Sequence, residues 1–201
     1  MQNSDYLISE NPMKALVFFS LPMIIGNLFQ QVYTMADSAI VGRLVGENAL
    51  AAVGAAYSLT NIFICIAIGG GIGASVIVSQ YFGRGSYGKL KKAVYTALIS
   101  FLLISGLLGG FGLLFSRKIM VALNTPAEVL DMSVTYLKIY FLGLPFLFMY
   151  NVLSSMFNAL GKSRIPLYFL IFSSLFNIVL DWIFVANFHL DVAGVAWATL
   201  I

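Results

Sequence analysis

From Asn48 to Gly83 the chain contains no Asp, Glu, Lys or Arg, and four further stretches of similar length carry few charges. A helix that spans a bilayer needs about 20 mainly apolar residues, so each of these stretches is long enough to cross a membrane. The whole chain is 60% hydrophobic and 9% charged, with a mean hydropathy of +0.94. A water-soluble domain could not remove that much apolar surface from solvent. The sequence therefore predicts an all-α, polytopic integral membrane protein.

We expect five complete transmembrane helices and the start of a sixth, because short polar connections separate the apolar runs. Residues 1–14 are interpreted as a cytoplasmic N-terminal segment without the features of a cleaved signal peptide. Residues 15–201 are interpreted as one transmembrane bundle. The chain is still apolar at Ile201, so we interpret it as a fragment of a longer protein. The expected helices cover residues 15–42, 48–82, 93–116, 130–159, 166–187 and, truncated, 192–201.

The basic residues predict the orientation of these helices. Seven of them precede the first helix or follow the second and fourth, whereas three lie in the alternate connections and Lys138 lies within the fourth helix. The positive-inside rule then places the N-terminus in the cytoplasm and the protein in the cell membrane. The formal net charge of +3 is small and scattered, so we expect no nucleic-acid partner.

Asp37 is the only charged residue between Lys14 and Arg43. An acid near the middle of a bilayer helix costs roughly 2.5–3.5 kcal/mol, so it needs a partner, a proton or a water-filled cavity. At about 100° per residue, the other polar residues of the helix fall with Asp37 within an arc of roughly 120°. They line a cavity in this interpretation, or they hydrogen-bond helices together in the alternative one. These residues are Asn27, Gln30, Gln31, Thr34 and Ser38.

A second intramembrane acid, Asp181, follows Asn177 by four residues, which places both side chains on one face of the fifth helix. The alternative reading makes Asp181 an interfacial residue beside the membrane anchor Trp182. Two buried acids with amide and hydroxyl oxygens can bind a small cation. Two neighbouring carboxylates cannot both stay ionised cheaply without one.

The fourth helix carries a further polar stripe. On a continuous helix the stripe falls on one side, although Pro145 interrupts the hydrogen-bond ladder. Its members are Tyr136, Tyr140, Asn151 and Asn158.

Two glycine pairs have the small-xxx-small spacing that lets another helix backbone approach closely, or in the alternative interpretation glycine is simply tolerated in membrane helices. They are Gly69 with Gly73 in the second helix and Gly106 with Gly110 in the third.

Enzyme chemistry fits these residues poorly. The single Cys65 and single His189 exclude a disulfide within the chain and the commonest metal-ligand sets. Asp37 and Asp181 could form an aspartyl protease dyad, but intramembrane proteases carry their acids in Tyr-Asp and Gly-x-Gly-Asp contexts that are absent at both positions. Ser75 lacks the Gly-x-Ser-Gly context of a rhomboid protease. We therefore expect a protein that is not an enzyme.

Several ordered motifs together resemble the multidrug and toxic compound extrusion (MATE) transporters. They are LPMIIGNLFQQVYTMADSAIVGRLVG at 21–46, ALAAVGAA at 49–56, GASVIVSQYFGRG at 73–85, and the pair Asn177 and Asp181 followed by GVAWAT at 194–199. The resemblance covers nearly the whole chain from Pro12 onward. It implies a twelve-helix fold of two six-helix lobes, of which this chain is the N-terminal lobe without the end of its sixth helix.

The resemblance also implies roles for individual residues. Asp37 would be the central carboxylate of a cation site completed by Asn177, Asp181 and Thr199, which would also be the metal ligands if the ion is Na⁺. Pro22 would be the position at which the first helix bends. The expected cavity-lining residues, from the polar arc and the resemblance together, are Gln30, Gln31, Thr34, Tyr136, Asn151 and Asn158.

The implied function is secondary active efflux of organic cations or amphipathic drugs in exchange for Na⁺ or H⁺. No cofactor is expected besides this coupling ion, and the expected partners are a small-molecule substrate, membrane lipid and the C-terminal lobe. The alternative is a lipid-linked-sugar flippase of the same superfamily. Cavities of that kind use basic residues to bind pyrophosphate, whereas the basic residues here lie near helix ends or in connections.

Overall fold

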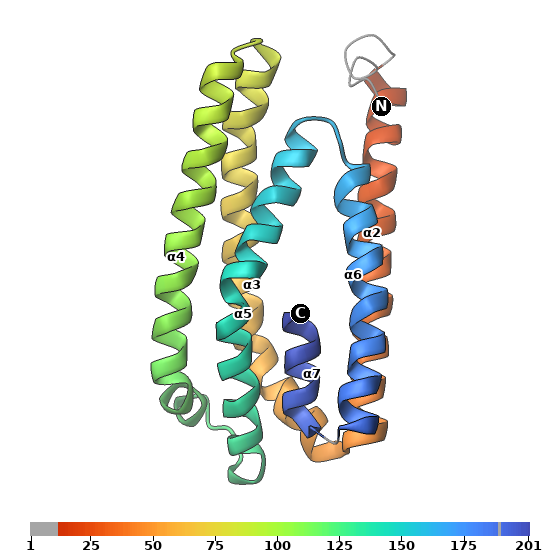
Figure 1. Ribbon diagram of the computed structural model, residues 1–201, viewed down its shortest axis with the longest axis vertical. Helices are drawn as coiled ribbons and strands as arrows, with labels where there is room; N and C mark the ends of the chain where they lie inside the picture. Colours follow the sequence, from red (N-terminus) through yellow and green to blue (C-terminus); the bar gives the residue numbers. More distant parts are fainter. Residues whose placement is uncertain (1–11, 189) are drawn as a thin grey trace.

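The computed structural model describes residues 12–188 and 190–201 as a bundle of long helices (Figure 1). The expected N-terminal segment, up to residue 11, and His189 lie outside the described residues. The described elements are α2 (Pro12–Ile40), η1 (Val41–Val45), α3 (Glu47–Gly83), α4 (Tyr87–Ala122), α5 (Ala127–Ala159), α6 (Arg164–Trp182), η2 (Ile183–Asn187) and α7 (Asp191–Leu200).

Five of the described helical segments are long and apolar enough to cross a membrane, which confirms the all-α, polytopic prediction. Several are longer than a perpendicular crossing requires. With 37 residues, α3 is about 55 Å long, whereas the hydrocarbon core is about 30 Å thick. The longest helices therefore tilt or project beyond the hydrocarbon.

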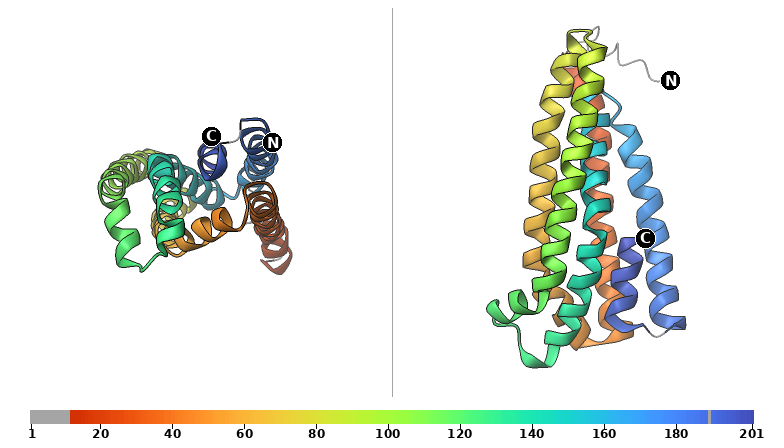
Figure 2. Two further views of the ribbon diagram at one scale, coloured as in Figure 1. Left: turned by 90° about the horizontal axis from the view of Figure 1, so that it is seen from below. Right: turned by 60° about the vertical axis from the view of Figure 1, so that its left-hand side comes forward.

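The helices form two groups. α5 packs against α3 and α4, while α2 packs against α6 on the other side of the molecule. The short α7 lies between α5 and α6 (Figures 1 and 2). Because the connections from α3 to α4 and from α5 to α6 lie at the end where α2 begins, α2 and α6 run in the same direction (Figure 1). Residues near their C-terminal ends therefore lie at the same level.

The core of the first group is built on α5. Leu137, Phe141, Leu144 and Phe148 are almost completely buried against α3 and α4. Hydrogen bonds add to this packing: the Tyr140 hydroxyl donates to the Thr60 carbonyl on α3 over 3.1 Å. Because the Tyr140 hydroxyl finds an acceptor within the protein, it is compatible with a lipid environment.

The close approaches are made by glycines one or two residues away from the predicted pairs. A Cβ atom added to Gly69, Gly73, Gly106 or Gly110 would meet no atom within 4 Å. On Gly109 of α4, by contrast, it would lie 2.8 Å from the backbone carbonyl oxygen of Phe141. The prediction that the 69/73 and 106/110 pairs mediate close packing is therefore wrong within this bundle. The spacing rule does not say which side of a helix meets its neighbour.

Gly109→Val should destabilise the α4–α5 contact, because the added atoms would press against backbone rather than a movable side chain. Overpacking of this kind costs about 1–3 kcal/mol, and each kcal/mol lowers the Tm of a chain of this size by about 2–4 °C. Gly106→Val on the same helix is the matched control and should leave the Tm nearly unchanged. Equal melting temperatures for the two variants in detergent would contradict the packing described here.

A candidate cation site between two acid-bearing helices

The two intramembrane acids come together where α2 lies beside α6. Asp37 lies near the end of α2 and Asp181 near the end of α6, and their carboxyl groups lie close enough to interact electrostatically. The parallel course of the helices brings both acids to one level. Asp181 is 0% exposed, so its side chain faces the protein and not the surrounding lipid or water.

The buried seam of α6 is polar, contrary to the usual pattern of water-soluble helices. Its buried residues are Ser174, Asn177 and Asp181, at helical spacings of three and four, while apolar side chains such as Leu175 and Val179 are exposed. In lipid this arrangement is the expected one, because apolar side chains face the acyl chains and polar ones face protein. The matching seam of α2 consists of Ala15, Pro22 and Gly26.

Five buried polar atoms at this contact have no hydrogen-bond partner within the protein. They are one carboxylate oxygen of Asp37, both carboxylate oxygens of Asp181, and the side-chain oxygen and nitrogen of Asn177. Burial of an unpartnered polar group is costly, and burial of an unpaired charge costs more. Four of the five atoms are oxygens, and three of these belong to carboxyl groups. The arrangement can therefore accept a proton or a small oxygen-preferring cation.

Hydroxyl groups surround the carboxyl pair. The side chains of Tyr33 and Thr199 lie close to each other, and the Thr199 hydroxyl donates to the Val195 carbonyl over 3.0 Å within α7. Tyr33 and Tyr136 both lie close enough to the two aspartates to interact with their charges. The structure thus brings Tyr136 and Asn177 to the acids, and Thr199 to Tyr33 beside them.

Tyr33 is the site residue that the sequence analysis missed. It precedes Asp37 by four residues, so the two side chains share one face of α2. Asp37 lies at the edge of the predicted polar arc. The face of α2 that contacts the acid pair therefore extends beyond the arc and includes Tyr33. The four-residue spacing from Tyr33 to Asp37 is the sequence feature that could have identified Tyr33 as a site residue.

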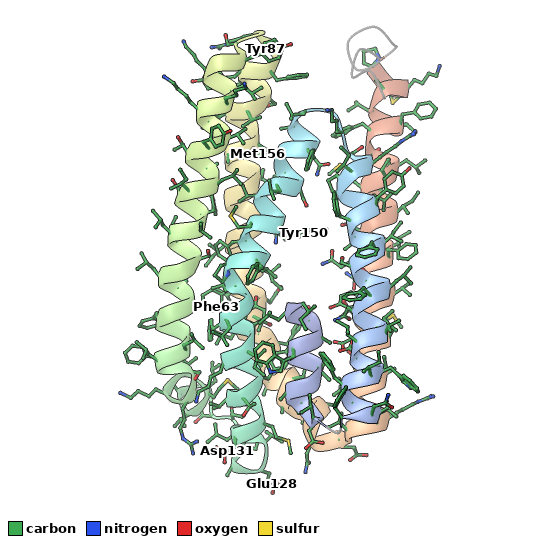
Figure 3. All side chains as sticks on the ribbon, viewed as in Figure 1. Phe63, Tyr87, Glu128, Asp131, Tyr150 and Met156 are labelled. Atoms are coloured by element: carbon green, nitrogen blue, oxygen red, sulfur yellow. The ribbon has the colours of Figure 1, made fainter. Side chains whose placement is uncertain are left out.

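A cavity of about 370 Å³ opens beside the carboxyl pair. Seven of its eighteen lining residues are aromatic, and Tyr33, Tyr136, Asn177 and Thr199 form part of the wall. Tyr150, on α5, contributes from further along that helix (Figure 3). Among the described residues that line the cavity there is no Asp, Glu, Lys or Arg. The other lining residues include Tyr140, Phe146, Phe172, Ser173, Ser174 and Phe176.

Of the expected cavity-lining residues, Tyr136 lines this cavity, whereas the other five are not part of its wall. Gln30, Gln31 and Thr34 are exposed on α2. The Asn151 amide donates to the Leu147 carbonyl over 2.8 Å, and the Asn158 side-chain oxygen is buried without a partner.

Pro22 is buried within α2, which continues through it from Pro12 to Ile40. Its expected role in bending remains a prediction.

Each acid-bearing helix changes to a π-helix just after its aspartate. η1 begins at Val41, following Asp37, and η2 begins at Ile183, following Asp181. π-helical turns are rare and are frequent at functional sites. The two segments meet in an apolar cluster that includes Val41 and Val185. This cluster therefore packs the two helices together just beyond the acids.

Asp181→Asn should raise the Tm in sodium-free buffer, because the substitution removes a buried charge beside a second carboxyl group. We expect an increase of about 2–4 °C for each kcal/mol gained. Asp131→Asn is the control, since that side chain is 81% exposed and paired with Arg117 over 2.6 Å, and surface pairs contribute about 0–1 kcal/mol. A lower Tm for Asp181→Asn than for the control would argue against an unsatisfied carboxyl pair.

Comparison with known proteins places this geometry in a family. The family model MatE matches residues 22–183. The probable multidrug resistance protein YpnP of Bacillus subtilis is 32% identical over 95% of this chain, and the multidrug export protein MepA of Staphylococcus aureus is 30% identical over 98% of it. The chain covers 43% and 44% of those two proteins, respectively.

Solved structures agree with these relatives. A multidrug resistance MATE family transporter of the MOP superfamily, in an outward-facing conformation, superposes with a TM-score of 0.92 at 26% identity, over 100% of this chain and 44% of that one. A MOP superfamily transporter from Pyrococcus furiosus gives the same values. The members of this family are transporters and not enzymes. With most of its length matched by the family model and all of it by these folds, the chain belongs to the MatE family of multi-pass membrane transporters.

Proposed function

We propose that the protein containing this chain exports organic cations or amphipathic compounds in exchange for Na⁺ or H⁺. The observation that carries the proposal is the group of unpartnered buried oxygens on Asp37, Asn177 and Asp181, beside an aromatic cavity. Because the chain spans about 44% of its relatives, a second lobe and the surrounding lipid would complete the transporter.

The proposed cation site can serve either coupling ion. For Na⁺, the ligands would be carboxylate oxygens of Asp37 and Asp181, the amide oxygen of Asn177 and the hydroxyl of Thr199. For H⁺, one proton held between the two carboxyl groups would remove one of the two charges. In both cases the occupant offsets the cost of keeping two acids out of water.

The substrate would occupy the aromatic cavity. Tyrosine and phenylalanine rings attract organic cations through their π faces and also cover flat apolar groups. The four residues shared between cavity and cation site, Tyr33, Tyr136, Asn177 and Thr199, provide the coupling. An occupant of either site changes the position of side chains that the other site needs, so ion and substrate can oppose each other.

The flippase alternative fits the cavity less well. Pyrophosphate recognition depends on arginine or lysine, and no basic side chain lines the cavity among the described residues. We therefore favour efflux of cationic or amphipathic compounds.

Asp37→Asn should abolish ion-coupled efflux while leaving membrane insertion intact, because the amide keeps the size of the side chain and removes its charge. The measurement is substrate export by vesicles that contain the full-length protein under an imposed ion gradient. Asp181→Asn should weaken coupling, and Asn177→Ala should lower ion affinity by about fivefold to tenfold, the loss expected for one neutral oxygen. Asp131→Asn, outside the site, is the control with normal export.

Reciprocity provides a stricter test of the same site. Raising the concentration of the coupling ion should lower substrate affinity in a binding assay, and this effect should vanish in Asp37→Asn. Normal export by Asp37→Asn along the ion gradient would overturn the mechanism.

We also propose the cell membrane as the location, with the N-terminus in the cytoplasm. A reporter that is active only in the cytoplasm should be active when fused after Gly88 or Lys162, and inactive when fused near Asn124. The opposite pattern would reverse the orientation.

A further inference from the structure

The tip of the α3–α4 hairpin carries a concentrated positive charge. Four basic residues, Arg84, Lys89, Lys91 and Lys92, lie within this short segment, and all four are exposed. The sequence contains no acidic residue between Glu47 and Glu128, so neither helix of the hairpin supplies a counter-charge near this tip. Figure 3 shows Tyr87 at the same end of the hairpin.

Within the described part of the chain, none of these four side chains forms an ion pair or a hydrogen bond. The opposite end of α4 differs. There, Arg117 pairs with Asp131, and the Lys118 ammonium group lies 5.5 Å from the centre of the Phe115 ring. The basic side chains at the two ends of α4 therefore differ: those near Arg117 have interaction partners, and those at the hairpin tip have none among the described residues.

The packing of α4 fixes where these cations point. Leu90, Ala93 and Val94 pack in the contact between α4, α3 and α5. At about 100° per residue, Lys92 lies on the opposite side of the helix from Leu90 and Val94, and Lys91 lies at the flank of that contact. Lys92 therefore faces away from the bundle, and Lys91 is exposed beside the packed face.

Two exposed tyrosines flank the lysines. Tyr87, Lys91 and Tyr95 are spaced by four residues, so they form one stripe along α4. The exposed fractions of Tyr87 and Tyr95 are 63% and 64%. Tyrosine is enriched where a membrane helix leaves the hydrocarbon, because its ring is apolar and its hydroxyl is polar. The stripe thus marks the depth at which lipid headgroups lie.

The length of the uncharged part of α4 supports this depth. Residues 93–116 carry no charge, and a helix segment of that length spans the hydrocarbon core of about 30 Å. Lys92 then lies at the edge of the hydrocarbon, and Lys89 and Arg84 lie among the headgroups.

We propose that this surface, defined by Arg84, Lys89, Lys91, Lys92, Tyr87 and Tyr95, binds anionic phospholipid headgroups. The ammonium and guanidinium groups bind the phosphate oxygens, and the two tyrosines pack against the upper acyl chains. Clusters of basic residues next to the cytoplasmic end of a membrane helix have this affinity. The assignment to the cytoplasmic leaflet rests on the orientation given under the proposed function, whereas the lipid preference itself does not.

The experiment measures energy transfer from a fluorophore at the tip to labelled lipids. The donor is attached to Gly88→Cys in a Cys65→Ala background of the full-length protein, because a side chain at residue 88 meets no atom within 4 Å. The protein is reconstituted in phosphatidylcholine vesicles that contain a small fraction of acceptor-labelled phosphatidylglycerol or acceptor-labelled phosphatidylcholine. The ratio of the two transfer efficiencies reports enrichment of the anionic lipid.

The expected result is a several-fold enrichment of phosphatidylglycerol, which falls toward unity in Lys89→Gln/Lys91→Gln/Lys92→Gln and decreases as salt is added. The matched control, Arg43→Gln/Arg117→Gln/Lys118→Gln, removes three cations from the other end and should keep the enrichment. An unaltered Tm in the tip variant shows that it is folded.

Equal transfer from both lipids in the starting protein, or an unchanged ratio in the tip variant, would overturn the proposal. Loss of enrichment on addition of millimolar inorganic phosphate at constant ionic strength would also overturn it, because the surface would then bind the free anion. No substrate or ion gradient is needed, so failure here is distinguishable from failure of the efflux mechanism.

Discussion

Everything near the cavity depends on the cost of keeping two carboxyl groups out of water. Asp181 is completely buried, Asp37 is half-buried beside it, and neither acid has a basic partner among the described residues. Such a pair opposes folding until something binds between the acids. The packing that offsets this cost lies elsewhere, in the contact of α5 with α3 and α4, where glycine lets helix backbones approach closely. Stability and the proposed ion site are thus assigned to different groups of helices.

The sequence predicts the helices and the identity of the acids, because both follow from properties that are local in the chain. A run of uncharged residues predicts a span, and an isolated aspartate within such a run predicts a site of some kind. The four-residue spacing of Asn177 and Asp181 likewise predicts a shared face. That Asp37 lies opposite Asp181 is not local. It depends on the parallel course of α2 and α6, and the resemblance to MATE transporters suggested it, whereas periodicity did not.

The periodicity of polar residues along a helix does not determine which side of that helix contacts its neighbours. On α2 the polar arc is expected to face a cavity; Gln30, Gln31 and Thr34 are exposed in this lobe, so that expectation stays a prediction, while contact with the acid pair runs through Asp37 at the edge of the arc and Tyr33 outside it. The glycine pairs show the same effect on α4, where Gly109 packs and Gly106 does not. In a membrane, lipid, protein and water compete for every face, so polarity alone does not identify the buried one. No residue pattern in the sequence predicted the π-helical segments that follow Asp37 and Asp181.

Sharing of residues between the two sites gives the proposed exchange its physical basis. A carrier that held ion and substrate in independent pockets would bind both at once and would have no reason to exchange them. Here Tyr33, Asn177 and Thr199 border the cavity and also adjoin the carboxyl pair. In the proposed mechanism, a cation bound between the acids would orient these side chains toward itself, and a substrate in the cavity would need them turned toward it. The π-helical segments pack against each other directly below the acids, so a change in the distance between the carboxyl groups is transmitted to both helices together. Ion occupancy can therefore be converted into a change in how α2 sits against α6, which is the movement that an exchange of ion for substrate requires.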